Sequence, residues 1–120
     1  YSATQSLTVG TSWIDTGING SELASGTYIV QLFVNKHAVG GQHYSEYYSG
    51  VMSWISGNIN STVSDELVLH RAGHAPNAGI LYLRVLRTAS ADTDDLKLQI
   101  RSNLSTTGNS NYVFKFRRMI

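Results

Sequence analysis

GTYIVQLFVN, residues 26–35, is the stretch of this chain that decides its fold. Its side chains alternate with a period of two, which is the period of a β-strand. One face carries Tyr28, Val30, Leu32 and Val34, and the other carries Ile29, Gln31 and Phe33. Because apolar groups occupy both faces, we expect this strand to be covered on both sides.

The same period recurs along the rest of the chain. Clear strands are predicted over residues 80–87, 95–101 and 112–116, and weaker ones over residues 5–9, 12–16, 49–55 and 66–71. On the second of these, Leu96, Leu98 and Ile100 face inward, whereas Lys97, Gln99 and Arg101 face outward. Clusters of Gly, Asn and Ser separate the strands, and no segment has the apolar stripe and caps of a helix.

About eight short strands in 120 residues predict an all-β fold, an antiparallel jelly-roll sandwich. Residues 1–120 form a single domain by length, with no internal repeat. Because the chain starts at Tyr1 without a Met, we expect it to come from the C-terminal end of a longer protein.

Composition excludes several kinds of site. There are no cysteines, so neither a disulfide nor a thiolate metal site can form. The formal net charge is +1 and no run of basic residues is long, so we expect no nucleic-acid partner. No stretch of eighteen apolar residues predicts a membrane span.

The strands with two apolar faces have two interpretations. They are either central strands covered by loops, or part of a sheet face that is buried against identical neighbours. Arg84 lies beside Tyr82 on the second face of such a strand, and a buried Arg needs a partner. That partner is an acid of another subunit or a small anion; alternatively, Arg84 simply faces solvent.

Several stretches are similar to known phage proteins. They are residues 25–31 (SGTYIVQ), 48–54 (YSGVMSW), 65–74 (DELVLHRAGH) and 81–84 (LYLR). Together they resemble the C-terminal domains of tail fibres and tail needles from bacteriophages of enteric bacteria. This resemblance implies a jelly roll like that of tumour necrosis factor, assembled as a homotrimeric knob at the virion tail tip.

The resemblance also implies a function. Such a knob contacts the host surface during attachment or envelope penetration, through a cell-surface glycan or an outer-membrane component. For the trimer interface we expect four residues from two strands: Tyr82, Arg84, Phe114 and Phe116. A carbohydrate-binding module of a secreted enzyme is the alternative function.

The most aromatic segment is HYSEYY, residues 43–48, which follows Gly40 and Gly41. Tyrosines in a glycine-flanked loop make a rigid amphipathic contact surface. We therefore expect receptor contact from Tyr44, Tyr47, Tyr48 and the nearby Trp54. Because Glu46 is costly to bury without a partner, at least part of this segment should face water. Alternatively, some of these rings belong to the core.

Catalytic and metal chemistry find little support. His70 and His74 are four residues apart on a predicted strand entering a loop, which is too far apart for one ion unless the loop curls back or three copies of one His meet on a trimer axis. Asp65 and Glu66 point to opposite faces of a strand, and the acids at 92, 94 and 95 lie in a predicted solvated turn. A glycosidase needs two carboxyl groups across a cleft. We therefore expect no enzymatic activity, no cofactor and no metal.

Overall fold

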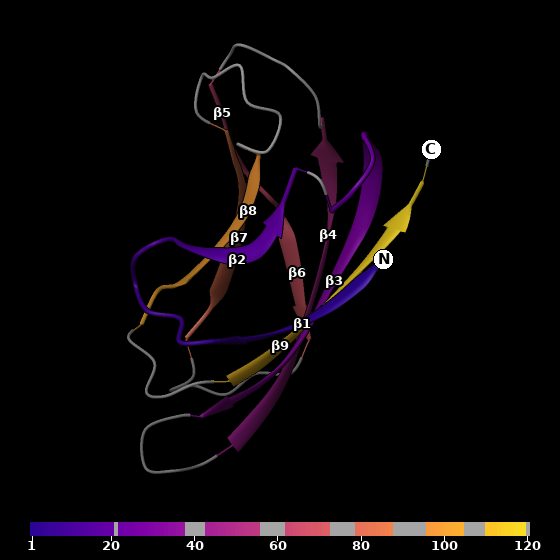
Figure 1. Cartoon of the computed structure of the whole chain (residues 1–120). Helices are drawn as coiled ribbons and strands as arrows, with labels where there is room; N and C mark the ends of the chain where they lie inside the picture. Colours follow the sequence, from indigo (N-terminus) through magenta and orange to yellow (C-terminus); the bar gives the residue numbers. More distant parts are fainter. Residues whose placement is uncertain are drawn as a thin grey trace.

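The computed structural model describes residues 1–20, 22–37, 43–55, 62–72, 79–87, 96–104 and 110–119. Across these residues, strands form two antiparallel sheets that face each other (Figure 1). The strands are β1 (Ser2–Leu7), β2 (Ile14–Asn19), β3 (Gly26–His37), β4 (His43–Trp54), β5 (Val63–Glu66), β6 (Leu69–Ala72), β7 (Leu81–Arg87), β8 (Lys97–Ser102) and β9 (Ser110–Arg118). The expected all-β sandwich is therefore confirmed.

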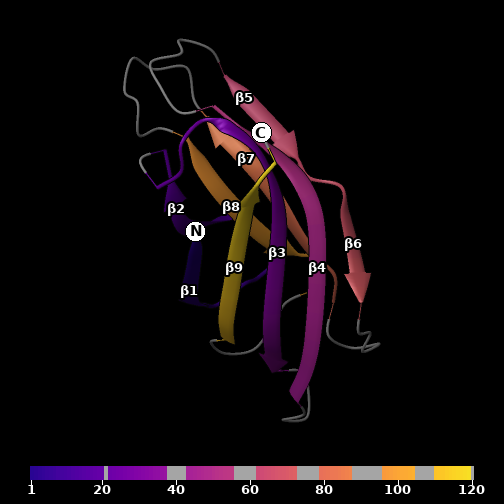
Figure 2. The ribbon, with the colours of Figure 1, turned by 90° about the vertical axis from the view of Figure 1, so that its right-hand side faces the viewer.

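Each sheet brings strands from the two ends of the chain together. The five-stranded sheet has the order β1-β9-β3-β4-β6, seen face-on in Figure 2. The four-stranded sheet has the order β2-β8-β7-β5. As a result, β1 pairs with β9 in one sheet and β2 pairs with β8 in the other. The long hairpin β3–β4 forms the middle of the larger sheet.

The core fills the space between the sheets, because alternate residues of each strand point inward. On β3 the inward set is Tyr28, Val30, Leu32 and Val34, and on β7 it is Leu81, Leu83 and Val85. These faces agree with the alternation in the sequence. The core also holds Trp54 from β4 and Phe114 from β9, both with 0% of their surface exposed.

The prediction of one strand over residues 66–71 is wrong. The chain leaves the four-stranded sheet after Glu66, and by Leu69 it has joined the five-stranded sheet beside Gly50. A Cβ on Gly50 would lie 2.6 Å from the carbonyl oxygen of Val68, so only glycine admits this close crossing. As a result β5 and β6 follow one another along one side of the sandwich (Figure 2).

The prediction of an aromatic loop over residues 43–48 is also wrong. The strand β4 begins at His43 and pairs with β3 along its whole length. From Ser45 to Tyr48, strand geometry therefore alternates the side chains between the core and the outer face of the five-stranded sheet.

Candidate functional site

The outer face of the four-stranded sheet carries two arginines stacked on two aromatic rings. The Cζ of Arg84 lies 4.5 Å from the centroid of Trp13, and that of Arg101 lies 5.1 Å from the same ring. The Cζ of Arg101 is also 4.4 Å from the centroid of Tyr82. We call Trp13, Tyr82, Arg84 and Arg101 the arginine–aromatic cluster. Such cation–π contacts stabilise guanidinium groups in fixed positions.

Strand pairing builds the cluster. Tyr82 and Arg84 point outward from β7, because the residues between and beside them are core. Across β8, Arg101 stands opposite Tyr82 and Gln99 stands opposite Arg84. Trp13 directly precedes β2, which is the neighbour of β8 on its other side. All four members of the cluster are half-buried.

A chain of polar contacts continues from the cluster. The Nε of Arg84 donates a hydrogen bond of 2.8 Å to Oε1 of Gln99. The Nε2 of Gln99 donates in turn to Oδ1 of Asp15 at 2.7 Å, and the other oxygen of Asp15 is 3.7 Å from Nζ of Lys97. Among the described residues, no carboxylate forms an ion pair with Arg84 or Arg101. The two guanidinium groups are therefore positioned but not neutralised.

The outer face of the five-stranded sheet is different, because it carries two groups of apolar side chains, with Gln31, Ser49 and Lys115 in the row between them. Phe33 lies between Val113 and Tyr47, and Ile29 lies beside Val51 in the strand register. We call these five residues the apolar face. Phe33 is 38% exposed and Val51 is 57% exposed. The Phe33 and Tyr47 rings are 5.0 Å apart.

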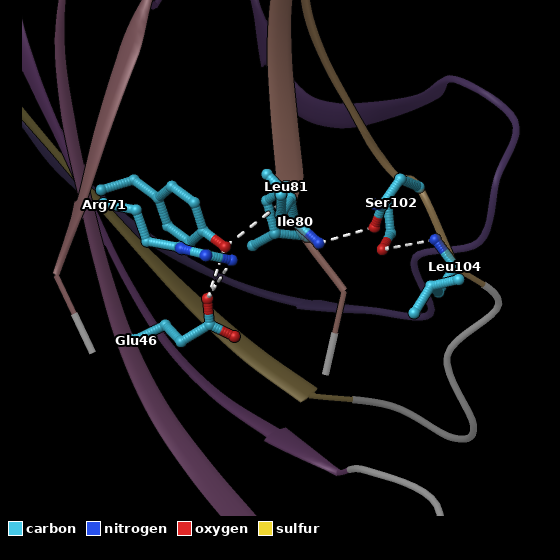
Figure 3. Close-up of polar contacts among 8 residues, drawn as sticks. Glu46, Arg71, Ile80, Leu81, Ser102 and Leu104 are labelled. Carbon is cyan, nitrogen blue, oxygen red and sulfur yellow. Dashed lines mark hydrogen bonds and ion pairs between the residues drawn. The ribbon is translucent and has the colours of Figure 1, made fainter. Parts of the chain in front are cut away.

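The carboxylate of Glu46, near the start of β4, is buried. Glu46 is 4% exposed, its Oε2 accepts a hydrogen bond of 2.5 Å from the hydroxyl of Tyr48, and it lies 3.9 Å from Nη1 of Arg71. Figure 3 shows Arg71 reaching from its strand toward Glu46. Beside them, the N–H of Leu81 donates a hydrogen bond of 3.2 Å to the hydroxyl of Tyr48. Glu46 is buried because β6 supplies the partner that its burial requires. Ser45 beside it is exposed, so part of this segment does face water.

This cluster raises the pKa of two tyrosines. Burial, reinforced by the hydrogen bond to Glu46, raises the pKa of Tyr48 far above its ordinary value. Burial and the charge of Glu46 raise the pKa of Tyr112 from 10.0 to about 12. The folded state therefore keeps both hydroxyls protonated at a pH where an unfolded chain releases the protons.

We expect stability to decline above pH 10 for this reason. A group whose pKa is higher in the folded chain than in the unfolded chain contributes fully to stability at a pH below its pKa in the unfolded chain. That stability is lost as the pH rises toward its pKa in the folded chain. Each tyrosine should lower the free energy of unfolding by about 1.4 kcal/mol per pH unit in that window. Urea unfolding at pH 9, 10 and 11 measures this slope. The slope should be about half as steep in Tyr112→Phe, and an unchanged slope would contradict the assignment.

The structure buries four of the residues expected to make external contacts. Tyr48 and Trp54 were expected to contact a receptor, but both lie in the core of a single chain. Phe114 and Phe116 were expected at the trimer interface, but they pack with each other inside the sandwich, 6.4 Å apart. These four expectations are wrong. The four side chains occupy inward-facing positions on β4 and β9, so their rings do not reach the outer surface of the sandwich.

The other expected contact residues reach the surface or lie outside the description. Tyr47 is half-buried on the apolar face, and its hydroxyl accepts a hydrogen bond of 3.0 Å from Nε2 of Gln31. Tyr82 and Arg84 lie in the arginine–aromatic cluster. The side chain of Tyr44 lies outside the described part of the structure.

An open groove runs along the side of the sandwich where the chain crosses between sheets. Its volume is about 400 Å³, and Met52, Asp65, Glu66, Val68 and His70 contribute to its walls. Asp65 and Glu66 are exposed neighbours on β5 and face opposite sides of their sheet. His74 and the acids at 92, 94 and 95 lie outside the described residues. In the described segments, no three acidic or His side chains gather as metal ligands.

Comparisons with known proteins give no identification, because neither a family model nor a curated protein matches the chain. None of the segments described is a helix long and apolar enough to cross a membrane.

Sequence reasoning missed Trp13, Arg101 and Gln99 as members of one surface. The outward position of Arg101 and Gln99 on their strand was predictable from the alternation of residues 95–101. Their adjacency to Trp13 was not, because it depends on β2 pairing with β8 from the far end of the chain.

Proposed function

We propose that this chain is the non-enzymatic knob of a bacteriophage tail needle or tail fibre. In this proposal three copies assemble at the virion tail tip and contact the host surface during attachment or envelope penetration. The observation that carries the proposal is the apolar face, where Phe33 with Tyr47 and Val113, and Ile29 with Val51, form two apolar groups on the outer side of a sheet. Phe33 and Val51 are exposed there, and exposed apolar side chains gathered on one face indicate an interaction surface.

The strand order supports a jelly roll. In a jelly roll the two ends of the chain run together and wind around the sandwich, as β1 does with β9 and β2 does with β8 here. The middle of the chain departs from the regular pattern, because β3 and β4 stay together in one sheet. We therefore propose a jelly roll in which the strands from the two ends of the chain pair as in the regular fold, whereas β3 and β4 form a hairpin within one sheet.

The two outer faces suit different partners. Apolar side chains are typical of permanent contacts between identical subunits, whereas stacked arginines are costly to bury without acids. We therefore propose that the apolar face, including Tyr47, makes the subunit contact. Tyr82 and Arg84, which the sequence suggested for that contact, then remain available to the host. Lys115, with its Nζ 5.5 Å from the Phe33 ring, pairs with Gln31 in the row between the two apolar groups of this face.

The mass in solution tests this proposal. Light scattering at low micromolar concentration should give about three times 13.1 kDa, and the trimer should persist on dilution. A trimer forms by closed symmetry when one surface meets a neighbour at a fixed rotation. A monomer of 13.1 kDa would contradict the knob and favour the alternative, a carbohydrate-binding module of a secreted enzyme. The half-buried aromatic rings of Trp13 and Tyr82 on an outer face would suit such a module.

A further inference from the structure

We infer that the arginine–aromatic cluster binds an oxyanion, a carboxylate or a phosphate, carried by a host-surface polysaccharide. The polysaccharide rests on the proposed function, whereas the oxyanion follows from the geometry of Trp13, Tyr82, Arg84 and Arg101 alone. The argument has three steps, which concern position, hydrogen-bonding capacity and charge.

Stacking holds both guanidinium groups in place before a ligand arrives. Arg101 lies over two rings, Tyr82 and Trp13, and Arg84 lies over Trp13 while its Nε is tied to Gln99. A free arginine loses rotamer entropy when it binds, and a stacked one has already lost much of it. The cluster is therefore preorganised for a ligand.

The remaining N–H groups suit a two-oxygen acceptor. A guanidinium presents donors in a planar fork, and carboxylate and phosphate groups match that fork with two parallel hydrogen bonds. Of the donors on Arg84, the Nε is used by Gln99. Within the described chain, Arg101 has stacking contacts but no hydrogen bond to a protein acceptor.

The acids near the cluster lie on either side of it. Asp15, on the β2 side, is engaged by Gln99 and Lys97. Glu66 stands opposite Arg84 in the β5–β7 register, yet the two form no ion pair. Among the described residues, no acid forms an ion pair with either guanidinium group of the cluster, so the centre of this face attracts an anion.

Tryptophan fluorescence can test this inference directly. The chain has two tryptophans, and Trp54 is fully buried in the core, so a ligand on the outer face reports through Trp13. The assembled protein would be titrated with a glucuronate oligosaccharide, a sugar phosphate, a neutral glucose oligosaccharide and inorganic phosphate. We expect saturable binding of one or both charged sugars, none of the neutral one, and weaker binding of inorganic phosphate. Tighter binding of the glucuronate oligosaccharide would identify the oxyanion as a carboxylate, and tighter binding of the sugar phosphate would identify it as a phosphate.

Two variants and one matched control define the residues. Arg101→Gln should weaken binding by about tenfold or more, because it removes hydrogen bonds to a charged group. Arg101→Lys should recover only part of the loss, because it restores the charge without the planar fork. Arg117→Gln removes the same charge from the outer face of the other sheet and should leave the affinity unchanged.

The outcomes separate this inference from the proposed function. Equal losses in Arg101→Gln and Arg117→Gln would overturn the site and indicate general charge attraction. Binding of neutral and charged sugars alike, or of no probe, would also overturn it. Binding of inorganic phosphate as tightly as the charged sugars would keep the oxyanion site and overturn the polysaccharide as its carrier. A protein that remains trimeric while failing these titrations would retain the knob and lose only the oxyanion site.

Discussion

Phe114→Ala lowers the free energy of unfolding by about 3–5 kcal/mol, which is the usual cost of removing a buried Phe side chain. Phe114 has no exposed surface, pairs with Leu32 and Ala3 in the sheet register, and stacks against Phe116 beneath β9. The truncation leaves a cavity between two sheets that cannot collapse onto it. Urea unfolding followed by fluorescence measures the loss.

Lys115→Ala is the matched control for Phe114→Ala. Lys115 is the next residue of the same strand, but it is exposed on the outer face. Its replacement should change stability by no more than about 0.5 kcal/mol. If the two variants were equally stable, the inward orientation of Phe114 and the whole register of β9 would be wrong.

Val51→Lys should dissociate the proposed trimer into folded monomers. Val51 is 57% exposed in a single chain, so an isolated domain accommodates lysine there without loss of its core. In the proposed assembly the same position is covered by a neighbour, and each buried ammonium group without a partner costs several kcal/mol. Because the symmetry repeats that cost in every copy, light scattering should show a mass near 13.1 kDa with an intact melting transition.

Ser64→Lys controls for the added charge. Ser64 is exposed on β5 and lies opposite Leu86, on the outer face of the four-stranded sheet. This variant should remain a trimer. Trimers from both variants would show that the subunits meet somewhere other than the apolar face.

Alternation in the sequence was sufficient to group the side chains of the long strands by face. It also placed Leu96, Leu98 and Ile100 inward, and the structure agrees because burial of one face fixes the register of a strand. For residues 26–35, where both faces are apolar, only the structure shows which face lies in the core. The same pattern could not locate the ends of strands. Residues 66–71 are uniformly strand-like, yet Gly50, which is distant in sequence, allows the chain to cross between sheets there.

The side-chain environments of the candidate site depended on long-range pairing. The cost of burying Glu46 without a partner was the reason to expect part of residues 43–48 in water, and only the pairing of β4 with β6 brings Arg71 to it. The aromatic segment was expected in a loop because it follows two glycines, yet pairing with β3 makes it a strand. Composition alone therefore could not separate a buried ring such as Tyr48 from a surface ring such as Tyr47.

The reactivity of a single thiol at position 51 tests most directly whether the apolar face joins the subunits. The chain has no cysteine, so Val51→Cys and Ser64→Cys each carry one thiol, on opposite outer faces. Both positions are exposed in a single chain, and a thiol reacts only where reagent can reach it. Our account predicts that Cys at position 64 is modified rapidly and Cys at position 51 slowly, until dissociation exposes it. Equally rapid modification of both thiols in the native protein would contradict the account.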